Sequence, residues 1–290
     1  MAIVSLGEIL NRANDKGYAV AAFNVSDVET AEQILEVAVN KKSPVIIQVW
    51  GGVFRAIRPE TLVPSLRRIA EGALVPVSLH LDHGSSFDEV RKGIDYGFSS
   101  VMIDASFEPF AENVQITSEV VDYAHRYGVD VEAELGLIGS ETSSGENVYR
   151  SGFTVPGDAK KFVEETDVDA LAVAVGSSHG LYKKEPKLDF SRIAQIKNQT
   201  QIPLVLHGGS GIPIQALQLA IKTGINKINF ATDINIAFFR SLQKILVDSP
   251  STLFPSLLLK PAREAMVPVI EEKIDFCFSA DKICYYKIKN

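Results

Sequence analysis

The sequence of 290 residues predicts an α/β fold built from eight parallel strands, and three observations support this fold class. Short β-branched or leucine-rich runs recur along the chain, several of them closed by glycine, as is typical of buried parallel strands. Helical patterns lie between these runs, which is the order of repeated βαβ units. No stretch rich in Pro, Gly and Ser suggests a linker. We therefore expect a TIM (β/α)8 barrel that forms a single domain over residues 1–290.

The expected strands follow one another through the whole chain, and amphipathic helices connect them. The strands cover residues 18–25, 45–50, 75–81, 99–104, 129–134, 170–175, 203–206 and 227–231. Residues 28–40 and 113–127 carry apolar side chains at helical spacing, and 213–223 begins with a proline, which helices tolerate at their start. Beyond residue 248 the barrel pattern ends, and residues 261–274 predict a terminal helix, so we expect a C-terminal helical extension.

A doubly wound open sheet is the alternative fold. Its nucleotide-binding members carry Gly-x-Gly-x-x-Gly after the first strand. Here Ala22-Phe23-Asn24-Val25 stands at that place, which favours the barrel.

Composition excludes several classes of protein. A net charge of −7 argues against a general nucleic-acid binder, which needs a basic face. The two cysteines, Cys277 and Cys284, are too few for a disulfide scaffold and suit a reducing compartment. The start of the chain lacks a basic segment followed by an apolar one, and no uncharged run reaches membrane-spanning length. We expect a soluble cytoplasmic protein with neither nucleic acid nor membrane as a partner.

Three of the five histidines occupy equivalent positions in the predicted fold. His83, His179 and His207 each follow an apolar run and stand next to glycine. They should therefore lie at the carboxyl ends of three strands, where α/β folds place their chemistry. One histidine in an apolar strand is usually a core residue, but three converging imidazoles would hold a zinc ion and leave its fourth position open. His80, inside a strand, and His125, in a helix, are expected to have no such role.

Three carboxylates also end strands. Asp82 precedes His83 and is a candidate proton carrier at a metal-bound substrate, or else a group that orients a histidine. Asp104 and Glu134 are candidates for hydrogen bonding to a metal ligand or for touching the metal themselves, although such carboxylates are often only solvated.

Two loops near the end of the barrel suggest a phosphate site. Residues 208–211 (GGSG) lead into a helix near residue 213, and residues 229–232 (NFAT) lead into another. The loops after strands seven and eight are the recurrent phosphate site of TIM barrels, where backbone N–H groups and helix N-termini meet the anion. A zinc ion beside this site would polarise the carbonyl of a phosphorylated ketone and stabilise an enediolate, as in aldol chemistry.

Taken together, these motifs resemble the class II, zinc-dependent fructose- and tagatose-bisphosphate aldolase family. The similar segments span nearly the whole chain: residues 22–25 (AFNV), 80–86 (HLDHGSS), 97–106 (GFSSVMIDAS), 131–136 (VEAELG), 172–182 (AVAVGSSHGLY), 205–213 (VLHGGSGIP), 229–233 (NFATD) and 260–266 (KPAREAM). The resemblance implies zinc ligation by the three strand-end histidines and makes Asp82 the acid/base residue at the carbon-4 hydroxyl. It implies that the contacts to dihydroxyacetone phosphate are Gly180, Gly208, Gly209, Ser210, Asn229, Ala231 and Thr232. It also implies a monovalent cation, Na⁺ or K⁺, near the phosphate, and a homodimer or homotetramer.

The chain departs from the family pattern at a loop, at Trp50 and in a tail, residues 283–290, that exceeds the expected length. Many members carry Gly-Gly-x-Glu-Asp in a mobile loop, and that glutamate moves the carbon-3 proton. Here the polar, glycine-rich segment 136–152 contains Gly139-Ser140-Glu141-Thr142, so Glu141 is our candidate base and Glu146 the second choice. Trp50 stands where many members have a small residue, near the distal end of the sugar.

We expect reversible cleavage of a phosphorylated ketose, fructose or tagatose 1,6-bisphosphate, to dihydroxyacetone phosphate and glyceraldehyde 3-phosphate. The alternatives are a related aldolase for another ketose phosphate and a non-catalytic sugar-phosphate-binding barrel, which the departure at Glu141 keeps open. A zinc-dependent barrel hydrolase commonly has His-x-His on its first strand, where this chain has Phe23-Asn24-Val25. A Schiff-base aldolase ranks last, because no lysine ends an expected strand.

Overall fold

The computed structural model describes residues 2–141, 147–148, 152–249 and 254–286. Eight strands form a closed barrel in which all neighbours are parallel, so the predicted fold class is confirmed. The barrel strands are β1 (Val20–Asn24), β2 (Val45–Trp50), β3 (Val77–Gly84), β4 (Ser100–Ile103), β5 (Asp130–Leu135), β8 (Ala170–Val173), β10 (Leu204–Leu206) and β11 (Ile225–Phe230). Their order around the barrel is β1-β11-β10-β8-β5-β4-β3-β2.

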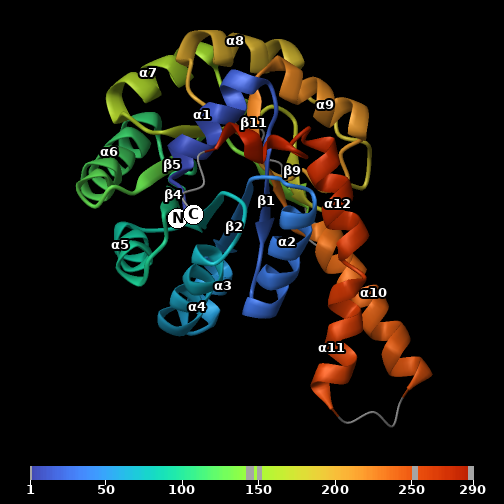
Figure 1. The fold of residues 1–290 in the computed structure, drawn as a ribbon. Helices are drawn as coiled ribbons and strands as arrows, with labels where there is room; N and C mark the ends of the chain where they lie inside the picture. Colours follow the sequence, from blue (N-terminus) through green and yellow to red (C-terminus); the bar gives the residue numbers. More distant parts are fainter. Residues whose placement is uncertain (1, 142–146, 149–151, 250–253, 287–290) are drawn as a thin grey trace.

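Helices surround the barrel (Figure 1), and side chains cap several of these helices. The helices between successive barrel strands are α2 (Val28–Asn40), α3 (Gly51–Ala56), α4 (Pro59–Glu71), α5 (Phe87–Tyr96), α6 (Phe110–Arg126), α7 (Pro156–Thr166), α8 (Phe190–Thr200) and α9 (Ile214–Thr223). Asp27, Ser86 and Asp189 precede three of these helices, and their side chains accept hydrogen bonds from first-turn backbone N–H groups. None of the helices formed by the described residues is both long enough and apolar enough to cross a bilayer.

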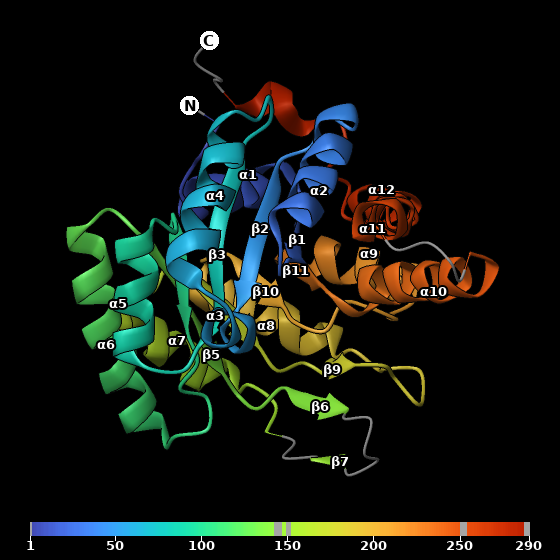
Figure 2. The same ribbon diagram turned by 90° about the horizontal axis from the view of Figure 1, so that it is seen from below.

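The C-terminal extension differs from the sequence prediction. The single helix expected over residues 261–274 is wrong, because the chain forms α11 (Pro255–Glu264) and α12 (Val267–Phe276) there. Pro268 is the second residue of α12; it has no backbone N–H and disfavours helical geometry at the residue before it, so a helix starts anew at this point. The long helix α10 (Thr232–Asp248) and α11 project together from the barrel (Figures 1 and 2).

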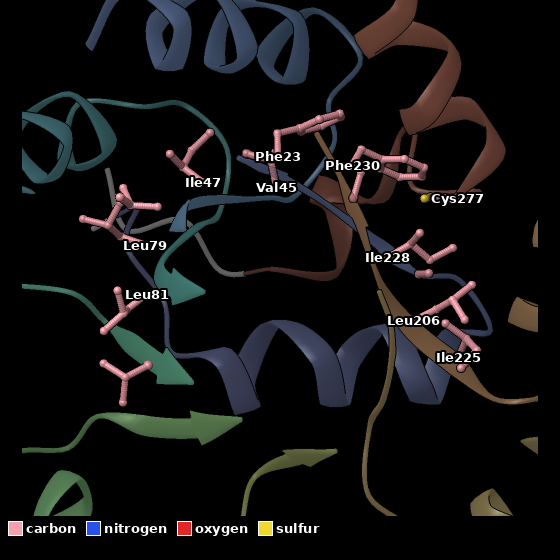
Figure 3. Close-up of a cluster of buried hydrophobic side chains, with 14 of the residues drawn as sticks. Phe23, Val45, Ile47, Leu79, Leu81, Leu206, Ile225, Ile228, Phe230 and Cys277 are labelled. Atoms are coloured by element: carbon pink, nitrogen blue, oxygen red, sulfur yellow. The ribbon is translucent and has the colours of Figure 1, made fainter. Parts of the chain in front are cut away.

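Successive side chains along each strand point alternately out of the barrel and into it, so the outer core is separate from the barrel interior. Outward side chains such as Phe23, Ile47, Leu79 and Phe230 form the main hydrophobic core under the helices (Figure 3). Inward side chains at the N-terminal end are apolar and form a second cluster with helix α1 (Leu6–Lys16). The next inward positions toward the C-terminal end carry polar side chains instead, among them Gln48, His80, Asp82, Glu132, Glu134, Lys227 and Asn229. The alternation therefore delivers polar groups to one end of the barrel.

The two ends of the chain close the other end of the barrel. The hydroxyls of Tyr18 and Tyr286 lie 2.8 Å apart, and the Tyr286 hydroxyl also donates to the carbonyl of Ile9 in α1. Burial raises the pKa of Tyr18 to about 12, so this hydroxyl pair is neutral. A short 3-10 helix, η1 (Lys282–Tyr285), leads into this contact. The C-terminal segment up to Tyr286 thus has a structural role beneath the barrel.

Candidate active site

A cavity of about 850 Å³ opens at the C-terminal ends of the barrel strands. Most of the site residues expected from the sequence line it: Asp82, His83, Asp104, Glu134, His179, Gly180, Gly208, Ser210, Asn229, Ala231 and Thr232. His207 and Gly209 lie just behind this surface, His207 being fully buried. His125 is elsewhere, on α6, where its Nε2 lies 2.9 Å from Asp169. The structure thus brings the predicted site residues together. His125, which was expected to have no role in the site, lies apart from them.

The three strand-end histidines converge on one point. The Nε2 atom of His83 lies 2.9 Å from Nδ1 of His207, and Nε2 of His179 lies 3.4 Å from the same atom. One ring nitrogen of each lies within 4.8 Å of those of the other two. Three neutral imidazoles with a free side toward a cavity are the donor set of a catalytic zinc site. The residues present therefore fit a zinc ion.

The backbone of His83 is unusual. This residue adopts the left-handed conformation, with φ of 53°, where the β3–β4 pairing is irregular. Its Nδ1 lies 2.7 Å from Oδ2 of Asp104, whose other oxygen accepts from the hydroxyl of Ser106 at 2.7 Å. Left-handed backbone costs energy for a residue with a side chain and is concentrated at functional sites. Here it aims Nε2 at the other two histidines, and Asp104 fixes the ring.

A buried ion pair between Glu132 and Lys227 orients the ring of His207. Nε2 of His207 lies 2.9 Å from Oε1 of Glu132, so that hydrogen bond leaves Nδ1 to face the other histidines. Oε2 of Glu132 in turn accepts from Nζ of Lys227 at 2.7 Å, and all three side chains are fully buried. The sequence interpretation missed both members of this ion pair. The available signal was the alternation in β5, where Glu132 and Glu134 share the inward face.

His80 and the lysines were expected to have no role in the site chemistry, and their positions can be compared with this geometry. His80 is buried inside the barrel, with Nδ1 2.9 Å from the Ser100 hydroxyl, and it is not part of the converging trio. Burial lowers its pKa well below the usual value. Lys227 lies in mid-strand and is ion-paired, and no lysine is found among the described residues that line the cavity. That distribution gives the Schiff-base alternative no suitable amine.

Asp82 is held between two amides. Its carboxylate accepts hydrogen bonds from Nδ2 of Asn24 at 2.8 Å and from Nδ2 of Asn229 at 3.0 Å. Gln48 donates to Oδ1 of Asn24 at 2.8 Å and so fixes that amide. In the metal-free protein, burial opposes ionisation of Asp82, but the nearby positive charges, led by that of His83, and the hydrogen bond from Asn24 together outweigh burial and lower the pKa of the carboxyl. Asp82 is thus an oriented, ionised base at the cavity floor.

A second group of possible ligands adjoins the trio. Ligand atoms of His83, Asp104 and Glu134 lie within 4.8 Å of one another. Without a metal, burial would lower the pKa of His83, but the surrounding carboxylates, led by Asp82, raise it to about 10. Burial and the charge of Asp104 raise the pKa of Glu134 to about 8. Burial opposes the ionisation of Asp104, but the hydrogen bond and charge of His83, together with the hydrogen bonds from Ser106, lower its pKa to about 2.

Across the mouth from β3 and β4, the loops after β10 and β11 form a narrow backbone surface. Gly208 has φ of 68°, and a Cβ atom there would collide with the carbonyl of Ser178. The hydroxyl of Ser210 accepts from the N–H of Asp233 at 3.2 Å, so the GGSG loop is tied to the first turn of α10. Side-chain-free backbone beside the start of a 17-residue helix is suited to a phosphate group.

A small sheet at the mouth places the loop glutamate. Strand β6 (Gly139–Glu141) pairs with β7 (Asn147–Val148) and runs parallel to β9 (Ser178–Gly180), at the end of the barrel opposite the termini (Figure 2). In this register the backbone of Glu141 is the partner of Gly180. The side chain of Glu141 and the whole of Glu146 lie outside the described part of the chain, so their roles stay predictions.

Known proteins are similar to this chain over almost its full length. The model of the family "Fructose-bisphosphate aldolase class-II" matches residues 4–282. A fructose-bisphosphate aldolase of Geobacillus stearothermophilus is 44% identical over 279 residues, which cover 94% of this chain and 96% of that protein.

Solved structures agree with this result. The crystal structure of the YdjI aldolase from Escherichia coli K12 has a TM-score of 0.86 and 34% identity, covering 97% of this chain and 99% of that one. A fructose-bisphosphate aldolase from Campylobacter jejuni, at 23% identity and a TM-score of 0.79, covers 97% of each chain and supports the fold alone. With the converging histidines and the oriented Asp82, these matches show that the chain belongs to the class II fructose-bisphosphate aldolase family, whose members are lyases that cleave a ketose bisphosphate by an aldol reaction.

Proposed function

We propose that this aldolase reversibly cleaves a ketose 1,6-bisphosphate, fructose or tagatose 1,6-bisphosphate, to dihydroxyacetone phosphate and glyceraldehyde 3-phosphate, with Zn²⁺ held by His83, His179 and His207. The observation that carries the proposal is the convergence of these three imidazoles beside the ionised Asp82. When bound there, zinc supplies Lewis acidity to the ketone oxygen of the substrate.

The chain's own residues would divide the remaining work. The backbone of Gly180, Gly208 and Gly209, with Ser210, Asn229, Ala231 and Thr232, would hold the phosphate and the ketone half of the substrate. Asp82 would take the proton of the carbon-4 hydroxyl as the bond between carbons 3 and 4 breaks, because it is ionised, buried and held by two amides. Asp104 and Glu134 would respectively orient His83 and offer a further carboxylate to the metal.

Glu141 is our proposed carrier of the carbon-3 proton. Its support is backbone placement, since β6 lies alongside the strand that carries His179 and Gly180. The segment 136–152 would close over the substrate and exclude water from the enediolate. The test is solvent-proton exchange into dihydroxyacetone phosphate by Glu141→Ala and Glu146→Ala. Loss in Glu141→Ala alone supports the assignment, loss in Glu146→Ala alone moves the role there, and normal exchange in both assigns the base to another residue.

Three further parts of the proposal concern partners and surroundings. A monovalent cation, Na⁺ or K⁺, would bind near the phosphate. A homodimer or homotetramer would cover the apolar side chains that α10 and α11 expose, among them Phe239, Val247 and Leu257. The described cysteines, Cys277 and Cys284, are unpaired, which suits a cytoplasmic protein.

The deciding experiment is cleavage of the two bisphosphate epimers side by side, with and without chelator. We expect chelator to abolish cleavage and zinc to restore it. Borohydride added with substrate should not inactivate the enzyme, because none of the described residues that line the cavity is a lysine able to form a Schiff base. Chelator-resistant cleavage with borohydride trapping would refute the metal mechanism, and no cleavage of either epimer by the zinc-loaded enzyme would refute the proposed substrates.

A further inference from the structure

The two halves of the substrate must lie toward opposite walls of the cavity. The phosphate surface follows β10 and β11, whereas β3 and β4 lie on the opposite side of the barrel order, with β2 next to them. A ketose held by its phosphate at the first wall therefore extends its aldehyde half toward the second. This step rests on the function proposed above.

Trp50 is the last residue of β2 and lies at that second wall. The other five residues of the strand are buried, but the indole is 50% exposed and lines the cavity. In the pairing of β2 with β3, Trp50 is the direct partner of Asp82. Paired strands lie about 4.8 Å apart, and Asp82 faces inward. Trp50 is thus the neighbour in the sheet of the residue that would take the carbon-4 proton, and both residues line the cavity.

The segment after β2 is shaped around this indole. A Cβ atom on Gly52 would collide with Cζ3 and Cη2 of Trp50, so the six-membered ring lies directly over Gly52. Any side chain at position 52 would displace the ring. Supported on this side by backbone, the ring leaves its exposed part for the cavity. A second exposed aromatic side chain, Phe107 from the loop after β4, lines the same wall.

We propose that Trp50, seated on Gly52, is the specificity-determining residue for the aldehyde half of the substrate, against whose C–H face the indole stacks. Aromatic rings bind the apolar face of a polyol chain by area burial and by the attraction of C–H groups to the ring. The aldehyde half begins at carbon 4, which is itself one of the two carbons of the bond that breaks. The contact therefore discriminates between aldehydes and between carbon-4 epimers, and it leaves the ketone half unaffected.

Substitution separates the two halves of the reaction. In Trp50→Ser, we expect KM for the preferred bisphosphate to rise about tenfold, the loss of a contact worth one aromatic stack, and the preference between the two epimers to change. Solvent-proton exchange into dihydroxyacetone phosphate should stay within about twofold of wild type. Trp50→Phe should recover most of the affinity, and Gly52→Ala should imitate Trp50→Ser. Phe87→Ser is the control, since Phe87 is an exposed aromatic residue at the start of α5 that does not line the cavity.

Trp50 is the only tryptophan in the sequence, so wild-type fluorescence gives an independent readout. With zinc-loaded enzyme, saturating dihydroxyacetone phosphate should leave the emission unchanged, and further addition of glyceraldehyde 3-phosphate should shift it to the blue. The inference is overturned if the first ligand alone gives the full shift, or if neither does. It is also overturned if Trp50→Ser keeps the wild-type KM and epimer preference, or loses exchange and cleavage in parallel. A wild-type enzyme that neither cleaves nor exchanges would instead refute the proposed function.

Discussion

Removing one member of the Glu132–Lys227 pair should be far more damaging than removing both. Both side chains are fully buried, and their charged atoms lie 2.7 Å apart. Lys227→Met leaves the carboxylate without its ammonium partner, and Glu132→Gln leaves the ammonium without a counter-charge. Breaking a buried pair in this way costs about 3–5 kcal/mol. Since typical domains unfold with only about 5–15 kcal/mol, each single variant should lose a large part of its stability.

The double variant Glu132→Gln/Lys227→Met restores neutrality inside the barrel. The amide oxygen of Gln can still accept from Nε2 of His207, and Met fills much of the volume of Lys. We therefore expect the double variant to be more stable than either single variant, because no uncompensated charge is left buried. Zinc affinity, measured by competition with a chelating dye, should follow the same order, since Glu132 orients His207.

The assay is urea unfolding of the metal-free proteins, arranged as a double-mutant cycle. Arg91→Met is a matched control: Arg91 pairs with Asp88 at 2.7 Å on the surface of α5, and its loss should leave the unfolding free energy nearly unchanged. The reasoning is refuted if the losses of the two single variants simply add in the double variant, or if Lys227→Met unfolds at the urea concentration of the wild type.

Three other outcomes follow from the site. His179→Ala or His207→Ala should lose zinc along with cleavage, while His125→Ala keeps both; full zinc occupancy by atomic absorption in the first two would remove them as ligands. Asp82→Ala should keep zinc and the fold but cleave about 10²–10⁴-fold more slowly, with proton exchange into dihydroxyacetone phosphate less affected; equal loss of both rates would make Asp82 a support for the metal site. In the metal-free protein, Glu134 keeps its proton up to about pH 8, whereas the unfolded chain releases it near pH 4.5. Stability should therefore fall as pH rises between these values, and Glu134→Gln should flatten that fall in urea unfolding; an unchanged slope would contradict it.

The parts of the site that could be predicted from the sequence are those marked by a pattern in neighbouring residues. His83, His179 and His207 each follow an apolar run and adjoin glycine, so their common place at strand ends could be read residue by residue. The positions of all eight barrel strands were likewise predicted to within a few residues. These features depend on short-range patterns of burial, which the order of residues records directly.

What escaped prediction depends on partners distant in the chain. Glu132 and Lys227 are 95 residues apart, and no pattern in the residues around either of them predicts that they form an ion pair. The left-handed backbone of His83 arises where β3 and β4 pair irregularly, which is a property of two strands together. The break between α11 and α12 did have a local signal, Pro268, but the apolar spacing on either side of it concealed the interruption.

The contacts of Tyr286 with Tyr18 and with Ile9 of α1 have a consequence for the synthesis of the chain on the ribosome. Strand β1 emerges early, yet its partner β11 is delivered only after residue 225, so the barrel cannot close until most of the chain has been synthesised. Tyr286, whose hydroxyl contacts Tyr18 and the carbonyl of Ile9 in α1, is synthesised later still, after every barrel strand. Until then the barrel strands already cover the apolar face of α1, but the hydroxyl of Tyr18 lacks its partner. Premature termination just before this tyrosine would leave a barrel with every active-site residue in place and α1 still at its base, but without the hydroxyl partner of Tyr18.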